Sequence, residues 1–413
     1  MVVPREGATE SRLRSQRERL LAATVEVVAE RGYEATRVKD LLQVSGVSRN
    51  AFYKIFSNKD ECFLAAVDQL VQVAGPAVLD VYGKAPGTWE QRMMAMLEAL
   101  GAMVAAYPAP ARVAWTEAYA AGDEAVRRVD RIDTRTERIV RGALAESPER
   151  AGLPPEVVRA LIGGLRKIIH TRLREGRERD LPGEMPQIFD WMLSYRTPPQ
   201  RLRRPRRPPP GLVPPARPAE GARDRILAAV AELVAEKGYQ SMAITEIASR
   251  AAVSLTTFYD LFAGKEDAFL ATMEFGMRRS MEAVAPVYTR ARDWPHAVAG
   301  GLHAFFALFS VDTALGRLGG VGTYESGLGA MESLDAAIVN AQALLAKGFE
   351  LHPDTPTVAA EGIGTSIYAL MSRQIRRRGA EHLYELAPTA AFIALAPFVG
   401  SEEAAVAANA EPV

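Results

Sequence analysis

Apolar residues recur with the period of an amphipathic helix along much of the chain. In residues 20–28 and 226–234 they fall at positions i, i+3, i+4 and i+7, which places them on one face of a helix. No segment shows the alternation of apolar and polar residues that is typical of a strand. The pattern therefore predicts an all-α fold.

The helical pattern occurs twice. Residues 17–64 align without gaps on residues 223–270 at a constant offset of 206, with 19 identities in 48 positions. Weaker similarity continues beyond these blocks, where Trp89 pairs with Trp294. A duplication of this kind indicates two homologous units in one chain.

Each repeated block predicts three short helices and the start of a fourth. In the first block the helices are expected at residues 16–31, 37–44 and 48–56, with a tight turn at 45–47. Gly32 is placed to end the first helix, and Ser48 to cap the third. Two short helices joined by a three-residue turn have helix-turn-helix spacing, in which the second helix enters the major groove of DNA.

The residues of both blocks resemble one family closely. The order Gly-Tyr, Val-Ser-x-x-x-Phe-Tyr-x-x-Phe-x-x-Lys and a following Phe-Leu is similar to the signature of TetR-family transcriptional regulators. The resemblance implies that Tyr53 and Lys59 contact DNA phosphates and that the residues after Ser48 read bases. A lysine at the start of a helix also suits phosphate binding, because the helix amides favour anions there. The predicted DNA-binding residues are Thr36, Ser48, Arg49, Asn50, Tyr53, Lys54, Lys59, Ser254, Thr256, Thr257, Tyr259 and Lys265.

The two blocks differ where bases would be read. Residues 45–59 carry a net charge of +3, whereas residues 251–265 are neutral because Asp260 cancels Lys265. Thr36, expected to cap the second helix, is matched by Met242 in the second block. We therefore expect the blocks to read unlike half-sites of an imperfect inverted repeat in double-stranded DNA.

The resemblance also implies a helical sensing region after each block. The resemblance implies a repressor that is released from DNA by a small hydrophobic ligand bound in a pocket of this region, although the same apolar side chains suit an ordinary core. Helices near residues 156–174 and 357–378 are expected to pair the halves as an intramolecular pseudo-dimer, and a further homodimer is left open. The predicted ligand-binding residues are Trp89, Met93, Met96, Tyr107, Trp115, Tyr119, Trp294, Phe305, Phe309 and Tyr324.

Residues 196–217 separate the halves with a run rich in proline and arginine that has no acidic residue. This composition favours extended polyproline II and predicts a solvated linker. The expected domains are an N-terminal arm (1–15), a first helix-turn-helix domain (16–74), a first ligand-binding and dimerisation domain (75–195), a linker (196–221), a second helix-turn-helix domain (222–275), a second ligand-binding and dimerisation domain (276–400) and a C-terminal tail (401–413).

Composition and motifs argue against several other classes of protein. Lys plus Arg and Asp plus Glu number 50 each, so any nucleic-acid signal must be local. Cys62 is the single cysteine, and the five histidines lack zinc spacing, so neither a disulfide nor a metal site is expected. No catalytic motif is present, which predicts no enzyme, no catalytic residues and no cofactor.

The N-terminus has no apolar signal region, and the longest apolar stretch is broken by prolines, which predicts a cytoplasmic protein with no membrane partner. The main alternative function is a protein-interaction adaptor with a degenerate second DNA-binding block. An adaptor of this kind would bind no DNA.

Overall fold

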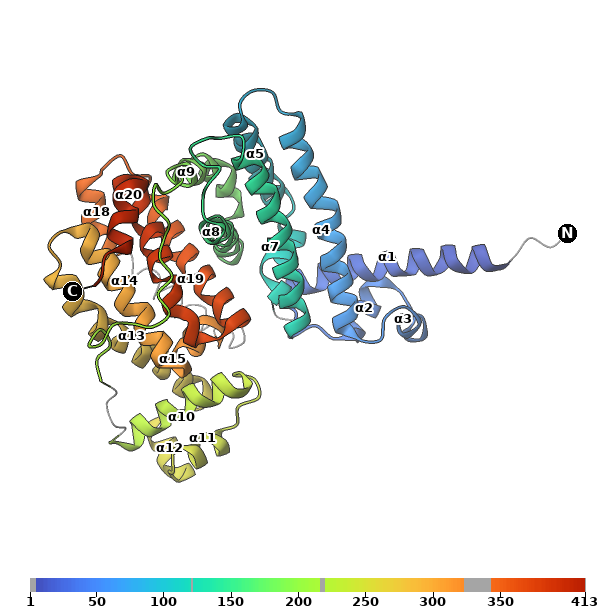
Figure 1. Cartoon of the computed structure of the whole chain (residues 1–413). Coiled ribbons are helices and arrows are strands. Elements are labelled where there is room, and N and C mark those ends of the chain that lie inside the picture. Colours follow the sequence, from blue (N-terminus) through green and yellow to red (C-terminus); the bar gives the residue numbers. More distant parts are fainter. Residues whose placement is uncertain (1–4, 120–121, 216–219, 323–342, 413) are drawn as a thin grey trace. The chain divides into compact units, whose positions relative to one another are not determined.

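Helices form the described secondary structure. The computed structural model describes residues 5–119, 122–215, 220–322 and 343–412, and these ranges contain no strand. Figure 1 shows the helices in chain order. The prediction of an all-α fold is confirmed.

The first half begins with the predicted helices. Helix α1 starts earlier than expected, whereas α2 and α3 lie within one residue of their predicted bounds. The elements of the first half are α1 (Arg5–Arg31), α2 (Val38–Ser45), α3 (Arg49–Ile55), α4 (Lys59–Lys84), α5 (Trp89–Ala106), α6 (Pro108–Trp115), η1 (Glu117–Tyr119), α7 (Gly122–Leu144), α8 (Pro155–Arg174), η2 (Glu178–Asp180) and α9 (Leu181–Leu193).

The second half repeats this order. The predicted pairing helices are present as α8 and α19, each within one residue of its expected limits. The elements of the second half are α10 (Ala222–Lys237), α11 (Ile244–Arg250), α12 (Leu255–Leu261), α13 (Lys265–Arg290), α14 (Trp294–Val311), α15 (Thr313–Arg317), η3 (Leu318–Gly322), η4 (Ala343–Leu345), α18 (Ala346–Leu351), α19 (Val358–Arg378), η5 (Ala380–Leu386) and α20 (Ala387–Asn409).

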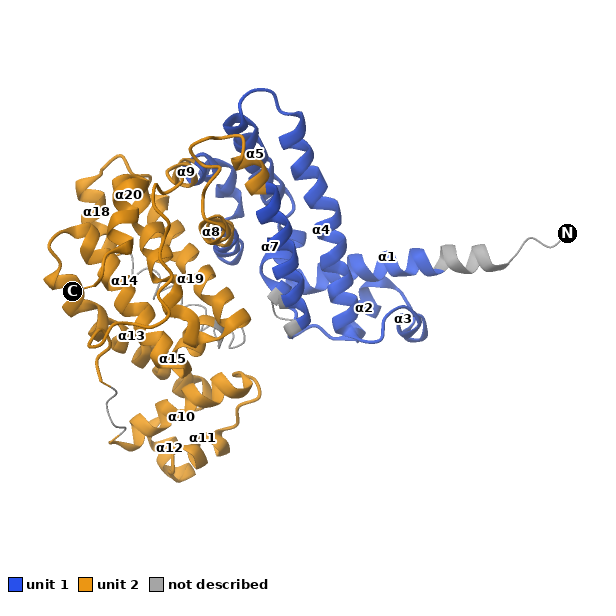
Figure 2. Ribbon diagram, in the orientation of Figure 1, with its two compact units in different colours: residues 1–139, 166–189 blue, residues 140–165, 190–413 orange. Residues whose placement is uncertain are grey.

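The chain divides into two compact units that do not coincide with its two halves. Unit 1 comprises Met1–Ile139 and Arg166–Phe189, and unit 2 comprises Val140–Leu165 and Asp190–Val413. Figure 2 shows the units in separate colours. Unit 2 thus contains the second half together with segments of the first.

Contacts inside unit 2 join helices of the two halves at small residues. A side chain at Gly163 of α8 would collide with Ala369 of α19, and one at Gly164 would collide with Ser366. Glycine permits this close approach because it carries no Cβ atom. The first part of α8, up to Leu165, therefore contacts α19 within unit 2, where pairing is predicted.

Two aromatic side chains extend this packing to α20. Trp191 and Tyr195, which lie at and just beyond the end of α9, have no exposed surface. The ring of Trp191 lies so close to Gly362 of α19 that a Cβ atom there would come within 2.7 Å of it. The Trp191 Nε1 group donates to the Tyr195 hydroxyl over 3.1 Å, which in turn donates to the backbone oxygen of Ile393 over 2.9 Å. Both polar groups of this aromatic pair are therefore satisfied in the interior.

The segment between the halves packs more closely than its composition predicts. Its arginines are largely exposed, as expected for a solvated linker, but Leu202 and Leu212 are buried. The backbone N–H of Arg203 donates to the side chain of Asn409 over 2.8 Å, and Asn409 donates to the backbone oxygen of Arg201 over 3.1 Å. The solvated-linker interpretation is thus wrong for Leu202 and Leu212, which are buried, and for the backbone that bonds Asn409.

The predicted C-terminal tail at residues 401–413 is corrected in the same way. Residues up to Asn409 belong to α20, beyond a kink at Gly400. Ala404 and Ala408 are fully buried. The run of small residues after Glu402 and Glu403 gives little sequence signal for the apolar face that packs in unit 2.

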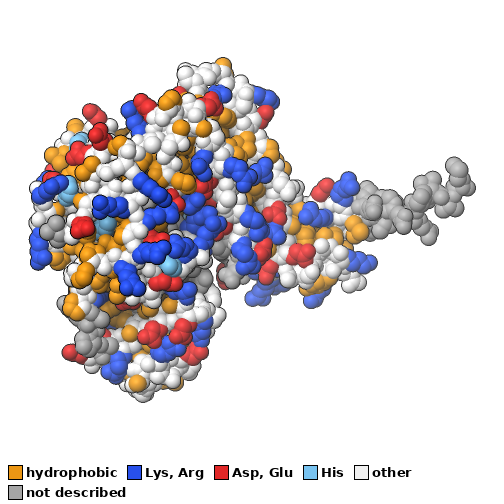
Figure 3. Space-filling view, in the orientation of Figure 1, with side chains coloured by type: hydrophobic (Ala, Val, Ile, Leu, Met, Phe, Trp, Pro, Cys, Tyr) orange, Lys and Arg blue, Asp and Glu red, His pale blue; other side chains and the backbone are white. Residues whose placement is uncertain are grey.

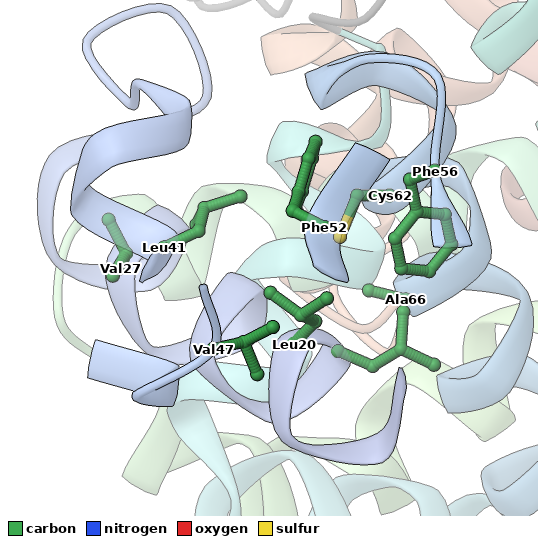
Figure 4. Close-up of a cluster of buried hydrophobic side chains, with 9 residues drawn as sticks. Leu20, Val27, Leu41, Val47, Phe52, Phe56, Cys62 and Ala66 are labelled. Atoms are coloured by element: carbon green, nitrogen blue, oxygen red, sulfur yellow. The ribbon is translucent and has the colours of Figure 1, made fainter. Parts of the chain in front are cut away.

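The core of the first helix-turn-helix domain is built from the positions that the periodicity selects. Leu20 and Val27 of α1 meet Leu41 of α2 and Phe52 of α3, as Figure 4 shows. Cys62 of α4 is buried in the same cluster. Helix α3 is therefore held against α1 by one face, which leaves its opposite face exposed.

Two helical stretches are long and apolar enough to cross a membrane by length and composition: Lys59–Lys84 and Ala380–Asn409. In the second stretch, 78% of the most apolar window is buried inside the protein. In the first, Cys62, Phe63 and Val67 pack in the cores of unit 1. Because 28% of the most apolar window is buried in the first stretch, we interpret only the second as a protein-packing helix.

Burial of His170 predicts acid-sensitive stability. His170 lies in α8, and its Nδ1 atom has no hydrogen-bond partner among the described residues. Burial, with Lys167 and Arg174 nearby, lowers the pKa of His170 to about 3, whereas an unfolded histidine has a pKa of about 6.5. Between these values the unfolded state binds a proton that the folded state excludes, so stability should fall below pH 6.5 by up to about 1.4 kcal/mol per pH unit.

Urea unfolding at pH 7.5, 6.0 and 5.0 measures this loss, with His170→Leu as the comparison. The variant should lose less stability than the wild type over the same interval, because leucine has no proton to exclude. An equal loss in both proteins would show that other groups cause the acid sensitivity.

Candidate DNA-binding surface

The turn between α2 and α3 has the geometry that the sequence predicts. Gly46 ends α2 with φ of +64°, a conformation that glycine adopts without steric cost. Ser48 is the N-cap of α3, where its hydroxyl accepts from the backbone N–H of Ala51 over 3.3 Å. The predicted turn and the predicted cap at Ser48 are confirmed.

The second head (residues 222–275) builds the same turn with different residues. Ala252 occupies the position of Gly46 and has φ of +51°, which is strained for a residue with a Cβ atom. Ser254 caps α12 and accepts from the backbone N–H of Thr257 over 2.9 Å. The two heads thus share a scaffold, although the second tolerates a less favourable backbone.

The exposed face of α3 carries predicted DNA-contacting residues of the first head (residues 16–74). Arg49, Asn50, Tyr53 and Lys54 are exposed, and 49% of Tyr53 is accessible. The Arg49 guanidinium lies 5.8 Å from the centre of the Tyr53 ring. In the described part of the chain, neither Arg49 nor Lys54 forms an ion pair, so both charges are available to a ligand.

The equivalent face of α12 is chemically different. Leu255 and Thr256 stand where the first head has Arg49 and Asn50, and both are exposed. Tyr259 is 57% accessible, whereas Thr257 is half-buried and its hydroxyl lies 2.9 Å from that of Ser254. Asp260 is exposed at the position of Lys54.

One lysine is held in the same way in both heads. Lys59 donates from Nζ to the backbone oxygen of Tyr33 over 3.0 Å and lies 4.0 Å from the centre of that ring. Lys265 makes the matching contacts with Tyr239, at 3.2 Å and 4.4 Å. Each ammonium group keeps further hydrogen-bond donors for a phosphate.

Thr36 does not lie where the sequence prediction places it. Only 2% of Thr36 is exposed, and its hydroxyl donates to the backbone oxygen of Gly32 over 2.7 Å. The N-cap of α2 is Arg37, whose backbone N–H donates to the Asp40 carboxylate over 2.9 Å. The capping prediction is therefore wrong, and burial favours a structural role for Thr36 over contact with DNA.

Charge is mixed outside the recognition helices. Figure 3 shows Lys and Arg side chains interspersed with Asp and Glu side chains over the visible face, in keeping with 50 of each class. In the second head, Arg250 pairs with Glu236 at 2.7 Å and with Glu232 at 3.2 Å. Within the described residues, no group of three or more His, Cys, Asp or Glu side chains is arranged to hold a metal ion.

The predicted ligand-binding residues of the first half are not gathered in one place. Trp89 and Met93 are buried and Met96 is half-buried in α5. Tyr107 follows the end of this 18-residue helix and is 64% exposed, so it lies about 27 Å from Trp89. The two cannot line one small pocket, which corrects the grouping predicted from sequence. Trp115 lies under the Arg166 guanidinium, 4.8 Å from its ring centre.

In the second half the corresponding residues make core contacts. Trp294 donates from Nε1 to the backbone oxygen of Leu344 over 3.2 Å, and its ring lies 5.2 Å from that of Phe398. Phe305 and Phe309 pack with ring centres 4.7 Å apart. The side chain of Tyr119 and the whole of Tyr324 lie outside the described residues.

Two polar contacts near the heads were not predicted from sequence. The Glu117 carboxylate accepts from the backbone N–H of Tyr33 over 2.8 Å. In the second half, Arg317 of α15 donates to the backbone oxygen of Ala235 in α10 over 2.6 Å. Only the fold brings these partners together, because they are 84 and 82 residues apart in sequence.

Comparison with known proteins finds the same family match in both heads. The family model for bacterial regulatory proteins of the tetR family matches residues 20–66 and 226–272. An uncharacterized HTH-type transcriptional regulator in the lacX 3′ region of Lactococcus lactis subsp. lactis is 33% identical over 61 residues, covering 15% of this chain and 31% of the relative. The uncharacterized HTH-type regulator YezE of Bacillus subtilis (strain 168) is 35% identical over 69 residues, covering 17% and 35%. The chain thus spans about a third of the length of these relatives.

Solved structures match less than half of this chain, with low TM-scores. The fatty acid degradation regulator FadR from Bacillus halodurans covers 43% of this chain and 94% of its own, with 16% identity and a TM-score of 0.40. FadR from Bacillus subtilis, solved in complex with stearoyl-CoA, covers 43% and 97%, with 18% identity and a TM-score of 0.36.

Proposed function

Because both helix-turn-helix segments of this chain belong to the tetR family of bacterial regulatory proteins, we propose that the protein is a DNA-binding transcriptional regulator whose two unlike heads read one imperfect inverted repeat. One observation carries the proposal. The two heads build the same cap and lysine contacts, yet they expose different side chains at equivalent positions of α3 and α12.

The exposed side chains favour different bases. Arginine pairs best with guanine and asparagine with adenine, so Arg49 and Asn50 suit a purine-containing half-site. Leucine and threonine instead make apolar contacts with the methyl group of thymine, which Leu255 and Thr256 can offer. Phosphate contacts from Tyr53, Lys59, Tyr259 and Lys265 would position the heads without reading sequence.

Regulation by a small hydrophobic effector is part of the proposal. Support in the first half comes from the apolar side chains at the start of α5, where Trp89, Met93 and Met96 lie on the same helix. An effector changes DNA affinity only if it binds the DNA-competent and DNA-incompetent states differently. Release of bound DNA by a panel of fatty acids of increasing chain length, followed in a mobility-shift assay, tests this part.

Selection of DNA sites from a randomised pool by the full chain tests the two-head proposal. We expect an inverted repeat with two unlike half-sites. The strand contacted by the first head should be rich in guanine and adenine, and the strand contacted by the second head should be rich in thymine. Recovery of perfectly symmetric palindromes would contradict the proposal of unlike heads, and recovery of no preferred sequence would favour the adaptor. The molecular mass of the protein–DNA complex shows whether one chain or two occupy the site.

The family is one of regulators, in agreement with the prediction that the protein is not an enzyme. A cytoplasmic location, where the protein would meet DNA, belongs to the same proposal.

A further inference from the structure

Tyr33 connects the first head to the helices that follow it. Gly32 ends α1 with φ of +79°, and Tyr33 comes next. The Tyr33 ring is buried and packs on Phe63 of α4 with ring centres 4.6 Å apart. This position fixes the Tyr33 peptide groups between the end of α1 and the start of α4.

The two backbone polar groups of Tyr33 have partners in different parts of unit 1. Its N–H donates to the Glu117 carboxylate over 2.8 Å, and its carbonyl oxygen accepts from Lys59 Nζ over 3.0 Å. The Lys59 ammonium also lies 4.0 Å from the Tyr33 ring centre. Glu117 and Lys59 thus bind opposite ends of one residue.

Glu117 occupies an unfavourable place for a carboxylate. It follows α6, which packs against α1, and it lies near the end of α1, where the helix carbonyl groups disfavour negative charge. Burial raises the pKa of Glu117, and the nearby Glu34 acts in the same direction. The hydrogen bond from Tyr33 opposes this effect and stabilises the carboxylate.

We propose that Glu117 is a positioning residue for DNA binding, which acts through the Tyr33 backbone to place Lys59 against a DNA phosphate. The inference rests on the proposed function, because it assigns Lys59 a phosphate contact. Through this contact the helices after the head influence the position of a DNA-binding side chain. Displacement of α6 and η1 would break the hydrogen bond from the Tyr33 N–H to Glu117 and free the Tyr33 peptide group to move.

The second head lacks this arrangement in its described part. Lys265 is held by Tyr239 as Lys59 is by Tyr33, but the polar contact from the helices that follow is made by Arg317 to the backbone oxygen of Ala235. Ala235 lies within α10, before the turn that carries Tyr239. The polar contact from the following helices therefore reaches the tyrosine that binds the lysine in the first half, but reaches Ala235 instead in the second.

Salt dependence of DNA binding by the full chain tests the role of Glu117. Each phosphate contact contributes about 0.9 to the slope of log K against log salt concentration. Glu117→Met, which keeps side-chain volume but removes the carboxylate, should lower the magnitude of this slope by about 0.9 and weaken binding. Loss of a negative charge would by itself strengthen binding to DNA, so the expected change has the opposite sign to the simple charge effect.

Five further variants complete the experiment. Lys59→Gln should lower the slope as Glu117→Met does, and the double variant should match Lys59→Gln alone. Glu117→Gln retains an acceptor for the Tyr33 N–H and should restore the wild-type slope. Glu34→Gln, a charge change at an exposed neighbour, should leave the slope unchanged. Glu117→Ala provides a second test if the methionine variant does not fold.

Additive losses in the double variant, or a wild-type slope for both Glu117→Met and Glu117→Ala, would overturn the role of Glu117. Failure of the wild-type chain to bind any selected DNA would instead overturn the proposed function. The two failures are therefore distinguishable.

Discussion

Exchanging the charges of Lys54 and Asp260 should change DNA affinity in opposite directions. Lys54→Asp should weaken binding about tenfold or more, and Asp260→Lys should strengthen it by a similar factor. The two residues occupy equivalent exposed positions on α3 and α12. A unit charge about 4 Å from a phosphate interacts by about 1 kcal/mol even at the dielectric constant of water. Reversal of its sign changes binding by about 2 kcal/mol, which exceeds a factor of ten.

Fluorescence anisotropy with a labelled selected site measures both affinities. Thermal unfolding of each variant provides the control, because substitutions at exposed positions should leave stability within about 0.5 kcal/mol of the wild type. An unchanged affinity for Asp260→Lys would show that the second head does not approach the phosphates, which contradicts the two-head proposal.

Removal of the Trp191 side chain should destabilise unit 2 severely. Trp191→Ala is expected to lower the free energy of unfolding by about 3–5 kcal/mol, the usual cost of deleting a buried large aromatic side chain. The substitution leaves a cavity against Gly362 and removes the hydrogen bond to Tyr195. Chemical unfolding followed by far-ultraviolet circular dichroism measures the loss.

Tyr107→Ala is the matched control, because it deletes a large aromatic side chain that is 64% exposed. It should change stability by less than about 0.5 kcal/mol. Equal losses in the two variants would mean that Trp191 contributes no more to the fold than a surface residue. The pairing of α9 with α19 would then not depend on it.

The sequence was sufficient for the features that depend on neighbouring residues. The periodicity selected Leu20 and Val27 as core positions, and both are buried. Ser48 is recognisable as a cap because a cap is a local hydrogen bond with a strong residue preference. The difference between the heads was also visible, since residues at the start of a recognition helix are exposed by its geometry.

Features that depend on distant partners were not predictable in this way. Leu202 and Leu212 lie among arginines and prolines, and nothing local indicates that unit 2 buries them. The family resemblance implies that Thr36 caps α2, but its hydroxyl instead donates to the carbonyl oxygen of Gly32. Glu117 carried one faint signal, an acidic residue within an otherwise apolar stretch around Trp115.

The anchoring of the linker on Asn409 has a consequence for the cell. A regulator assembled from separate subunits loses its paired form on dilution, so its occupancy of an operator depends steeply on copy number. Here α8 and α19 belong to one polypeptide, so each chain is synthesised with both helices. For one chain per operator, we therefore expect low occupancy to rise in simple proportion to the number of chains, and a single mutation to alter recognition of one half-site while that of the other stays unchanged.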